Sequence, residues 1–321
     1  MLFLTARLPA TDADATTYET RAVEALQVTT HTFDVADDGA NAARHEQIVD
    51  LLSAQPSDAP VLVSSTVLPL MGGVLRAEAR RLRVVIMCHR PTARDPRFTA
   101  IAPAALDDID AQTLKYARRV VVPSLHTAMS IGAFGVLPDQ LAVITPGADK
   151  APLAEGGASF HIVMHAPVDH NSGHDGVIDV VASIPHATID FVVTAGNPSY
   201  LADMRSKADM LMGSRVTWSA DVKAAFHRAD LAVLAYRYDP HGIGILEALA
   251  RGLPVVTTNS GAAQNLLPKD AGLTLGPQAL TRVTPKILAL LQQGAQRARD
   301  DVRSWSTVGA DLTREIGFAC R

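Results

Sequence analysis

Two carboxylates stand on either side of a glycine-containing loop in the stretch from residue 229 to residue 257. Asp239 precedes the sequence Pro-His-Gly-Ile-Gly, and Glu247 follows it within an apolar, helix-like segment. Glycine lets a backbone approach a ligand closely, and the free N–H groups at the start of a helix favour an anion. An acid on each side of such an anion could hold hydroxyl groups about a phosphate. A structural turn between a strand and a helix would show the same pattern, so the spacing alone leaves both interpretations open.

The elements that must position these residues alternate along most of the chain. Short apolar runs are separated by longer segments of helical period, which is typical of βαβ units and a parallel sheet. We expect strands at residues 2–4, 61–64, 84–88, 120–123, 141–144, 160–165, 189–194, 216–218, 231–235, 254–257 and 273–275. We expect helices at residues 18–26, 45–52, 73–82, 106–116, 125–133, 176–183, 221–228, 245–250 and 285–297. The pattern predicts an α/β protein.

The segment from residue 145 to residue 157 is rich in turn residues and lacks a hydrophobic period, so we place a domain boundary there. The expected divisions are 1–155, 156–300 and a C-terminal helical segment, 301–321, that crosses back to the first domain. We expect two Rossmann-like domains, each a doubly wound parallel sheet. They would face a central cleft between the carboxyl ends of both sheets, where ligands of such sheets usually bind.

Composition excludes several classes of protein. The 321 residues are 48% hydrophobic and 19% charged, as in an ordinary globular protein, which excludes disorder as a description of the whole chain. The net charge of −4 provides no global basic field for a nucleic-acid backbone. The two cysteines cannot form a disulfide framework. With no long apolar run and no basic leader segment, we expect a cytoplasmic protein without a transmembrane segment.

The stretch around the two carboxylates resembles the donor-site signature of the family-4 retaining glycosyltransferases, which have the glycosyltransferase-B fold. The matching residues are Asp239-Pro240-His241-Gly242, then Glu247-Ala248-Leu249-Ala250, then Arg251-Gly252-Leu253-Pro254-Val255-Val256, without a gap. Residues 117–149 resemble the end of that family's first domain, and residues 161–167 resemble the opening of its second. Residues 84–89 resemble a strand that ends in a histidine facing the cleft. The resemblance covers about residues 84–275.

The resemblance implies a role for each matching residue. Glu247 would hold the ribose hydroxyls of a nucleotide, and Asp239 would lie beside the donor sugar. The backbone N–H groups of His241, Gly242 and Ile243 would meet the sugar and the phosphate. His89 would lie near the transferred sugar, and the turn at Gly261 and Ala262 would back the nucleotide.

The implied reaction is transfer of a hexose, with retention, from a nucleotide-diphosphate sugar of the UDP or GDP type to an acceptor hydroxyl. It would serve the synthesis of a glycan, polysaccharide or glycoconjugate. Residues 1–155 would be the acceptor side and 156–300 the donor-binding domain. The resemblance implies no metal and no cofactor, and the sequence holds no Asp-x-Asp metal clamp. The expected partners are the nucleotide sugar and an acceptor sugar or glycoconjugate, with no nucleic acid.

Three departures from the family pattern favour an alternative. The family's phosphate-binding Arg and Lys are missing at the start of the second domain, where His165 and the segment 171–176 stand. The first strand is not followed by a glycine-rich loop, and Asn265 replaces a common Glu. Loss of two cations beside a diphosphate weakens stabilisation of the leaving group. The alternative is a catalytically impaired protein that binds a nucleotide sugar or serves as a partner subunit. A third interpretation keeps the fold with another reaction, such as epimerisation or phosphorolysis.

Two further clusters have simpler interpretations. Arg76, Arg80 and Arg83 would share one face of a first-domain helix and could contact an anionic membrane at the inner face. A solvated helix face is the alternative, with Glu78 relieving the charge. The pairs His161/His165 and His170/His174 have the spacing of a helical metal site, but they fall on an expected strand and loop. We therefore predict no metal site.

Overall fold

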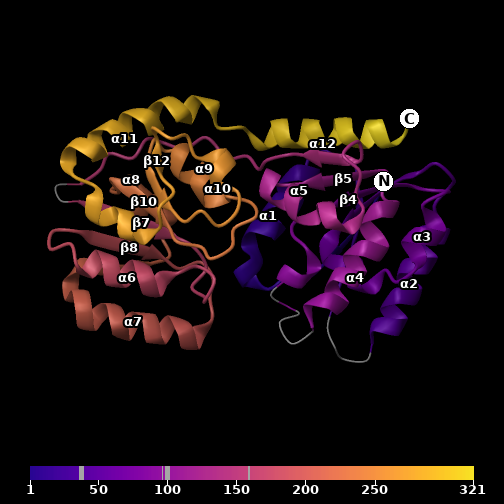
Figure 1. Ribbon diagram of the computed structural model, residues 1–321, viewed down its shortest axis with the longest axis horizontal. Helices are drawn as coiled ribbons and strands as arrows, with labels where there is room; N and C mark the ends of the chain where they lie inside the picture. The colour runs from indigo at the N-terminus through magenta and orange to yellow at the C-terminus, as the bar shows by residue number, and fades with distance from the viewer. Residues whose placement is uncertain (36–39, 96, 98–101, 158–159) are drawn as a thin grey trace. The chain divides into compact units, whose positions relative to one another are not determined.

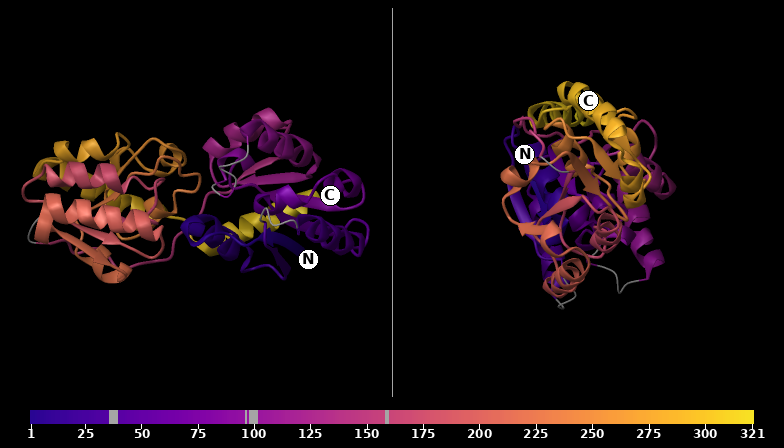
Figure 2. Two further views of the ribbon diagram at one scale, coloured as in Figure 1. Left: turned by 90° about the horizontal axis from the view of Figure 1, so that it is seen from below. Right: turned by 90° about the vertical axis from the view of Figure 1, so that its left-hand side faces the viewer.

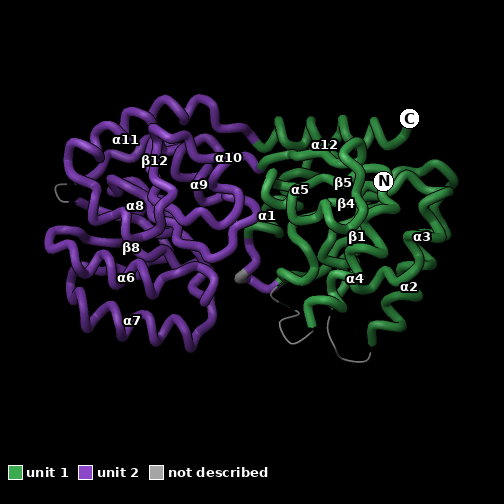
Figure 3. The backbone as a smooth tube through the Cα atoms, viewed as in Figure 1, with its two compact units in different colours: residues 1–8, 14–145, 305–321 green, residues 9–13, 146–304 purple. Residues whose placement is uncertain are grey.

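The computed structural model describes residues 1–35, 40–95, 97, 102–157 and 160–321, which form two compact units. Unit 1 contains residues 1–8, 14–145 and 305–321, and unit 2 contains residues 9–13 and 146–304 (Figure 3). Each unit is built around one six-stranded parallel sheet with helices on both faces (Figures 1 and 2). This confirms the predicted class of two Rossmann-like doubly wound domains.

The sheet of unit 1 has the strand order β2-β1-β3-β4-β5-β6. Its strands are β1 (Leu2–Ala6), β2 (Thr29–Phe33), β3 (Pro60–Ser64), β4 (Arg83–Met87), β5 (Arg119–Val122) and β6 (Leu141–Val143). Its helices are α1 (Ala13–Val23), α2 (Asn41–Ser53), α3 (Val74–Glu78), α4 (Pro103–Thr113), α5 (Leu125–Ile131) and α12 (Trp305–Ala319). Helix α12, from the end of the chain, packs on β4 and β5.

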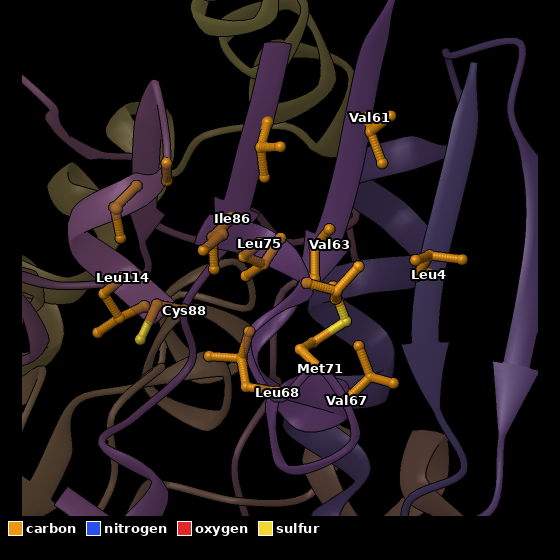
Figure 4. Packing of buried hydrophobic residues seen from close by; sticks show 14 of the residues in the cluster. Leu4, Val61, Val63, Val67, Leu68, Met71, Leu75, Ile86, Cys88 and Leu114 are labelled. Atoms are coloured by element: carbon orange, nitrogen blue, oxygen red, sulfur yellow. The ribbon is translucent and has the colours of Figure 1, made fainter. Parts of the chain in front are cut away.

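Alternate residues of the inner strands β1, β3, β4 and β5 are buried on opposite faces, as expected for a sheet covered on both sides. On one face Leu4, Val63 and Ile86 pack with Leu68, Met71 and Leu75 from the segment that follows β3 (Figure 4). The residues between them in the strands, such as Leu62 and Val85, are equally buried on the other face. The near-continuous apolar sequence of these strands follows from this double burial.

The sheet of unit 2 has the strand order β12-β11-β10-β7-β8-β9. Its strands are β7 (His161–His165), β8 (Thr188–Val192), β9 (Val216–Ser219), β10 (Leu231–Leu234), β11 (Val255–Thr257) and β12 (Gly272–Leu273). Its helices are α6 (His174–Ala182), α7 (Pro198–Met212), α8 (Val222–His227), α9 (Ile243–Leu249), α10 (Ala263–Leu266) and α11 (Pro285–Ala298). Ile162 and Met164 of β7 pack on the α6 and α7 side, and Val163 packs on the α8 and α9 side.

The structure corrects three expectations. The edge strand β2 was not predicted, because its residues Thr-Thr-His-Thr-Phe bury only Phe33. Helix α7 was also missed, because its polar face is wide and few of its residues are buried. Helix α3 ends at Glu78 rather than near residue 82, and Arg83 begins β4, where it pairs with Asp58. The predicted basic helix face of Arg76, Arg80 and Arg83 was therefore wrong.

Candidate functional site

The loop that carries Asp239 joins β10 to α9 at the carboxyl edge of the second sheet. One carboxylate oxygen of Asp239, Oδ1, accepts hydrogen bonds from the backbone N–H groups of His241 at 3.1 Å and Gly242 at 2.7 Å. Within the described chain, Oδ2 forms no hydrogen bond. Burial raises the pKa of the Asp239 carboxyl, although these two hydrogen bonds act in the opposite direction. Asp239 thus shapes its own loop with one oxygen and keeps the other uncommitted.

Two glycines allow this loop to close. Gly242 has φ +72°, and a Cβ there would lie 2.5 Å from a methyl of Leu266. Gly261 has φ +148°, and its Cβ would lie 1.9 Å from the carbonyl oxygen of Asp239. The backbone of Asp239 pairs with this second turn, donating to Ser260 O at 2.9 Å and accepting from Ala262 N at 2.8 Å. The turn at Gly261 and Ala262 is therefore fixed directly against the Asp239 loop.

Glu247 lies in α9 and faces the end of β7. Its Oε2 lies 3.0 Å from Nδ1 of His165, the last residue of that strand. The Glu247 side chain is 30% exposed and His165 21%. Burial would raise the pKa of this carboxyl, but the His165 hydrogen bond and the charges of His165 and Arg251 outweigh burial and hold its pKa below the usual value. Among described residues, Oε1 has no hydrogen-bond partner, so an ionised oxygen is available to a donor.

Arg251 and Phe226 complete the surroundings of Glu247. The guanidinium of Arg251 lies 4.4 Å from the ring centre of Phe226 and donates to the backbone oxygen of Glu247 at 2.7 Å. The ring of His165 meets the same Phe226 edge-on, with ring centres 6.0 Å apart. Phe226 is almost fully buried. It therefore supports both basic side chains that act on the Glu247 carboxyl.

A second loop, between β7 and α6, is tied to the residues that precede Asp239. The side chain of Asn171 donates to Tyr238 O at 2.9 Å and accepts from Tyr238 N at 3.0 Å. Arg237 donates to both oxygens of Asp175, at 3.2 and 3.0 Å, which holds the pKa of Asp175 below its usual value against the effect of its burial. The acid that stands in the segment where the family pattern has Lys is thus paired with Arg237.

The remaining predicted residues of unit 2 lie in the Asp239 loop, at the start of α9 and in the adjoining turn at Gly261 and Ala262. The His241 side chain is 1% exposed and Ile243, the first residue of α9, is 6% exposed, so both are packed inside. The backbone N–H groups of His241 and Gly242, which we expected to meet a ligand, donate to Asp239 instead. Ala262 is fully buried. These residues build the loop and its surroundings, and among the described residues Oε1 of Glu247 and Oδ2 of Asp239 remain as acceptors without a hydrogen bond.

His89 lies in unit 1, two residues after the end of β4, and its side chain is buried. Its Nε2 lies 2.8 Å from Oε1 of Glu19 on α1. The other oxygen of Glu19 accepts from Thr5 at 2.6 Å, and the backbone N–H of His89 donates to Ser65 at 3.1 Å. The ring meets Tyr18 edge-on, with centres 5.8 Å apart. His89 is therefore held in one orientation by Glu19 and Tyr18 of α1 and by Ser65, which follows β3.

Sequence reasoning did not identify Glu19, or the partnership of His165 with Glu247. No spacing rule relates these residues, because each pair joins segments far apart in the chain. The one available signal was positional, since His165 and His89 each stand at the end of an apolar strand. The described part of the chain contains no group of three or more His, Cys, Asp or Glu side chains arranged to hold a metal ion. Among the described helices, none has the length and hydropathy needed to cross a membrane.

Residues 159–293 match the family described as Glycosyl transferases group 1. A glycogen synthase of Mycobacterium tuberculosis is 28% identical over 166 residues, which is 46% of this chain and 40% of the relative. This chain thus matches well under half of the length of that curated relative. The family match lies within unit 2 and includes the Asp239 loop and α9.

Solved structures show the same fold over nearly the whole chain. The Anabaena protein HepE, in complex with UDP and glucose, gives a TM-score of 0.76 at 14% identity and covers 98% of this chain and 99% of its own. A sucrose-phosphate synthase from Thermosynechococcus elongatus gives 0.73 at 16% identity, with 98% of both chains covered. The chain has the glycosyltransferase-B fold, with two parallel six-stranded sheets and flanking helices.

Proposed function

We propose, from the match of residues 159–293 to the group 1 glycosyl transferases, that this chain is a glycosyltransferase that uses a nucleotide sugar. In the finer form of the proposal, it moves a hexose from a UDP or GDP sugar to an acceptor hydroxyl, with retention and without a metal. The product would be a glycan, polysaccharide or glycoconjugate made in the cytoplasm, at most in contact with the inner face of a membrane. Likeness to HepE, whose structure contains UDP and glucose, supports a nucleotide sugar as the donor.

The arrangement of Glu247 carries this proposal. Its Oε2 is held by His165, its Oε1 is uncommitted, and its lowered pKa keeps the carboxyl ionised at neutral pH. An ionised carboxylate oxygen that faces a partly open surface accepts O–H donors strongly, because charge-assisted hydrogen bonds are the stronger class. The ribose hydroxyls of a nucleotide are such donors. Glu247 is therefore the residue that we assign to the nucleotide.

Asp239 would act on the sugar through its Oδ2. The Oδ1 atom is committed to the backbone of His241 and Gly242, which fixes where Oδ2 lies. A fixed acceptor beside the donor sugar would orient it, and orientation of the reacting groups lowers the barrier without any covalent step. His89, oriented by Glu19, would contribute to the same reaction from unit 1. The protein would mainly stabilise charge on the leaving diphosphate while the acceptor attacks from the same face.

A second function, that of a nucleotide-sugar-binding partner without transfer activity, is favoured by one observation. Arg237, a cation beside the donor loop, is paired with Asp175 through both carboxylate oxygens. A cation neutralised in this way gives less stabilisation to a leaving diphosphate. Binding through Glu247 would then survive while turnover is lost.

The experiment that tests both functions begins with a thermal-shift panel of UDP, GDP, ADP, TDP and their common sugar conjugates. A ligand at 100 times its dissociation constant adds about 2.7 kcal/mol to the stability of the folded state. A selective shift supports a donor site and names the base, and release of the nucleoside diphosphate then measures turnover. A shift without turnover supports the partner function. Absence of any shift would contradict both.

A further inference from the structure

A pocket of about 270 Å³ lies in unit 2 beside the Glu247 cluster and outside the Asp239 loop. One wall is the segment from Lys150 to Leu153, and the others come from α8 and from Arg251, which follows α9. It shares Phe226 and Arg251 with the surroundings of Glu247. None of its lining residues is among those to which the resemblance assigned a role.

Among the residues that the structure describes, the lining contains basic side chains and no carboxylate. Lys150, Lys223, His227 and Arg251 line the pocket. The ammonium groups of Lys150 and Lys223 form no hydrogen bond or ion pair with any residue that the structure describes. Nε2 of His227 lies 3.4 Å from Oε2 of Glu155, and both side chains are exposed. The charge of the Glu247 carboxylate acts on the Arg251 guanidinium. Two unpaired ammonium groups and a guanidinium around one small volume produce a strongly positive potential, which favours an anion.

The wall made by residues 150–155 is fixed in place by backbone hydrogen bonds. Ala154 N donates to Arg251 O at 3.0 Å, and Glu155 N donates to His227 O at 2.8 Å. From the other side, Arg299 donates to Ala151 O at 2.7 Å. These bonds tie the segment to both basic elements of the pocket. The pocket is therefore a built feature of unit 2.

The rest of the lining is apolar. Ala151, Pro152 and Leu153 contribute aliphatic surface, and Phe226 forms the floor under the Arg251 guanidinium. Stacking on the ring orients Arg251, whose single bond to Glu247 O leaves further N–H groups for a ligand. A guanidinium presents paired donors that match phosphate oxygens, and an ammonium adds a compact charge. The pocket therefore suits a phosphate joined to a small apolar or ring-shaped body.

We propose that the pocket formed by Lys150, Lys223, Phe226 and Arg251 binds the phosphate group of a small phosphate ester. The phosphate oxygens lie between the two ammonium groups and the guanidinium, and the organic part lies on the exposed side chains of Pro152 and Leu153. Such a group comes either from the nucleotide sugar itself or from a separate phosphorylated small molecule. The first source rests on the proposed function, since the pocket adjoins the carboxylate assigned to the nucleotide.

The test uses the full chain and phenyl phosphate, which carries a phosphate on an apolar ring and no nucleoside. Its dissociation constant is measured by calorimetry for the natural chain and for the double variant Lys150→Ala/Lys223→Ala. The matched control is Lys269→Ala/Lys286→Ala, which removes the same charge from exposed unit 2 lysines outside the pocket. We expect at least a tenfold increase in the dissociation constant for the pocket variant and less than a twofold increase for the control.

Competition identifies the source of the phosphate. If the nucleotide found by the thermal-shift panel displaces phenyl phosphate and its own affinity falls in the pocket variant, the phosphate belongs to the donor. If nucleotide affinity is unchanged in that variant, the ligand is a separate phosphate ester. Equal affinity of the natural chain and the pocket variant for phenyl phosphate would overturn the proposal. So would equal losses in both double variants, or no binding at millimolar concentration. Phenyl phosphate binding without nucleotide binding would reject the proposed function alone.

Discussion

The Nδ1 atom of His165 lies 3.0 Å from Oε2 of Glu247, so the last residue of β7 holds a carboxylate of α9. From the sequence resemblance we expected a cation near this position, and the structure places the His165 ring against the Glu247 carboxylate. The pair keeps Glu247 ionised and directs its other oxygen away from His165. The principal acceptor of the candidate site is thus oriented by a residue 82 positions earlier in the chain.

Replacement of Glu247 tests the central assignment. Glu247→Ala should raise the dissociation constant of the nucleotide by tenfold or more, because a charge-assisted hydrogen bond contributes about 1.5–3 kcal/mol. The unfolding temperature without ligand should change little, since the side chain is partly exposed. Calorimetric titration measures the affinity, with the exposed Glu46→Ala as control. Unchanged affinity would remove Glu247 from the site.

Two variants of Asp239 should distinguish its role in the structure of the loop from a role in catalysis. Asp239→Ala loses the acceptor for two backbone N–H groups and should cost about 1–2 kcal/mol of folding stability. Asp239→Asn keeps an acceptor oxygen and should be closer to the natural chain in stability. If Oδ2 holds the sugar, both variants should lower turnover more than nucleotide affinity. Normal turnover in Asp239→Asn would limit Asp239 to a role in the loop.

The buried pair of Glu19 and His89 should be sensitive to loss of one partner. Glu19→Ala removes the carboxylate that His89 and Thr5 both contact, and a buried polar group that loses its hydrogen-bond partner costs about 1–3 kcal/mol. Glu19→Gln retains one acceptor oxygen and should cost less than half as much. Urea unfolding monitored by circular dichroism measures the difference. Equal losses in the two variants would argue against the hydrogen bonds as the cause.

His174 should make unit 2 sensitive to acid. It lies buried beside the stacked rings of Phe191 and Trp218, with no hydrogen-bond partner for either ring nitrogen in the described structure, and burial lowers its pKa from 6.5 to about 4. The unfolded chain binds this proton more readily, so stability is complete above pH 6.5 and falls as the pH decreases towards 4. That shift corresponds to about 3 kcal/mol. His174→Phe should flatten this part of the stability profile, measured by unfolding at each pH. A profile as steep as that of the natural chain would contradict the assignment.

Gly261 should not tolerate a side chain. In Gly261→Ala the new Cβ would meet the carbonyl oxygen of Asp239 at 1.9 Å, so the Asp239 loop must move. We expect a loss of several kcal/mol in stability together with loss of nucleotide-sugar turnover. Gly317→Ala is the matched control, because the site on α12 is open and alanine favours a helix by about 1 kcal/mol. A stable and active Gly261→Ala variant would show that the turn adapts.

The elements that could be predicted from the sequence are those determined by a local pattern of residues. Strands that are buried on both faces, such as β3 and β10, can be recognised in the sequence as apolar runs. The Asp239 loop and the Glu247 helix can be recognised because they form one continuous motif. The edge strand β2 could not be found, because only Phe33 is buried and pairing to β1 determines its structure. The partners of Glu247 and His89 could not be found either. Contacts between side chains that meet only after folding leave no periodicity in the chain.

The contact between Asn171 and Tyr238 constrains the two loops unequally. Asn171 uses both its amide oxygen and its amide nitrogen, whereas Tyr238 contributes only backbone atoms. Aspartate at position 171 would lose the donated bond, and leucine would lose both bonds. Glutamine, whose side chain is one methylene longer, would not place its amide at the same distance from Tyr238. Position 238 could change its side chain without disturbing this contact. Among relatives that keep this loop pairing, asparagine should thus persist at position 171 while the residue at position 238 varies. The identity of residue 171, and not that of residue 238, would then indicate that the two loops are paired.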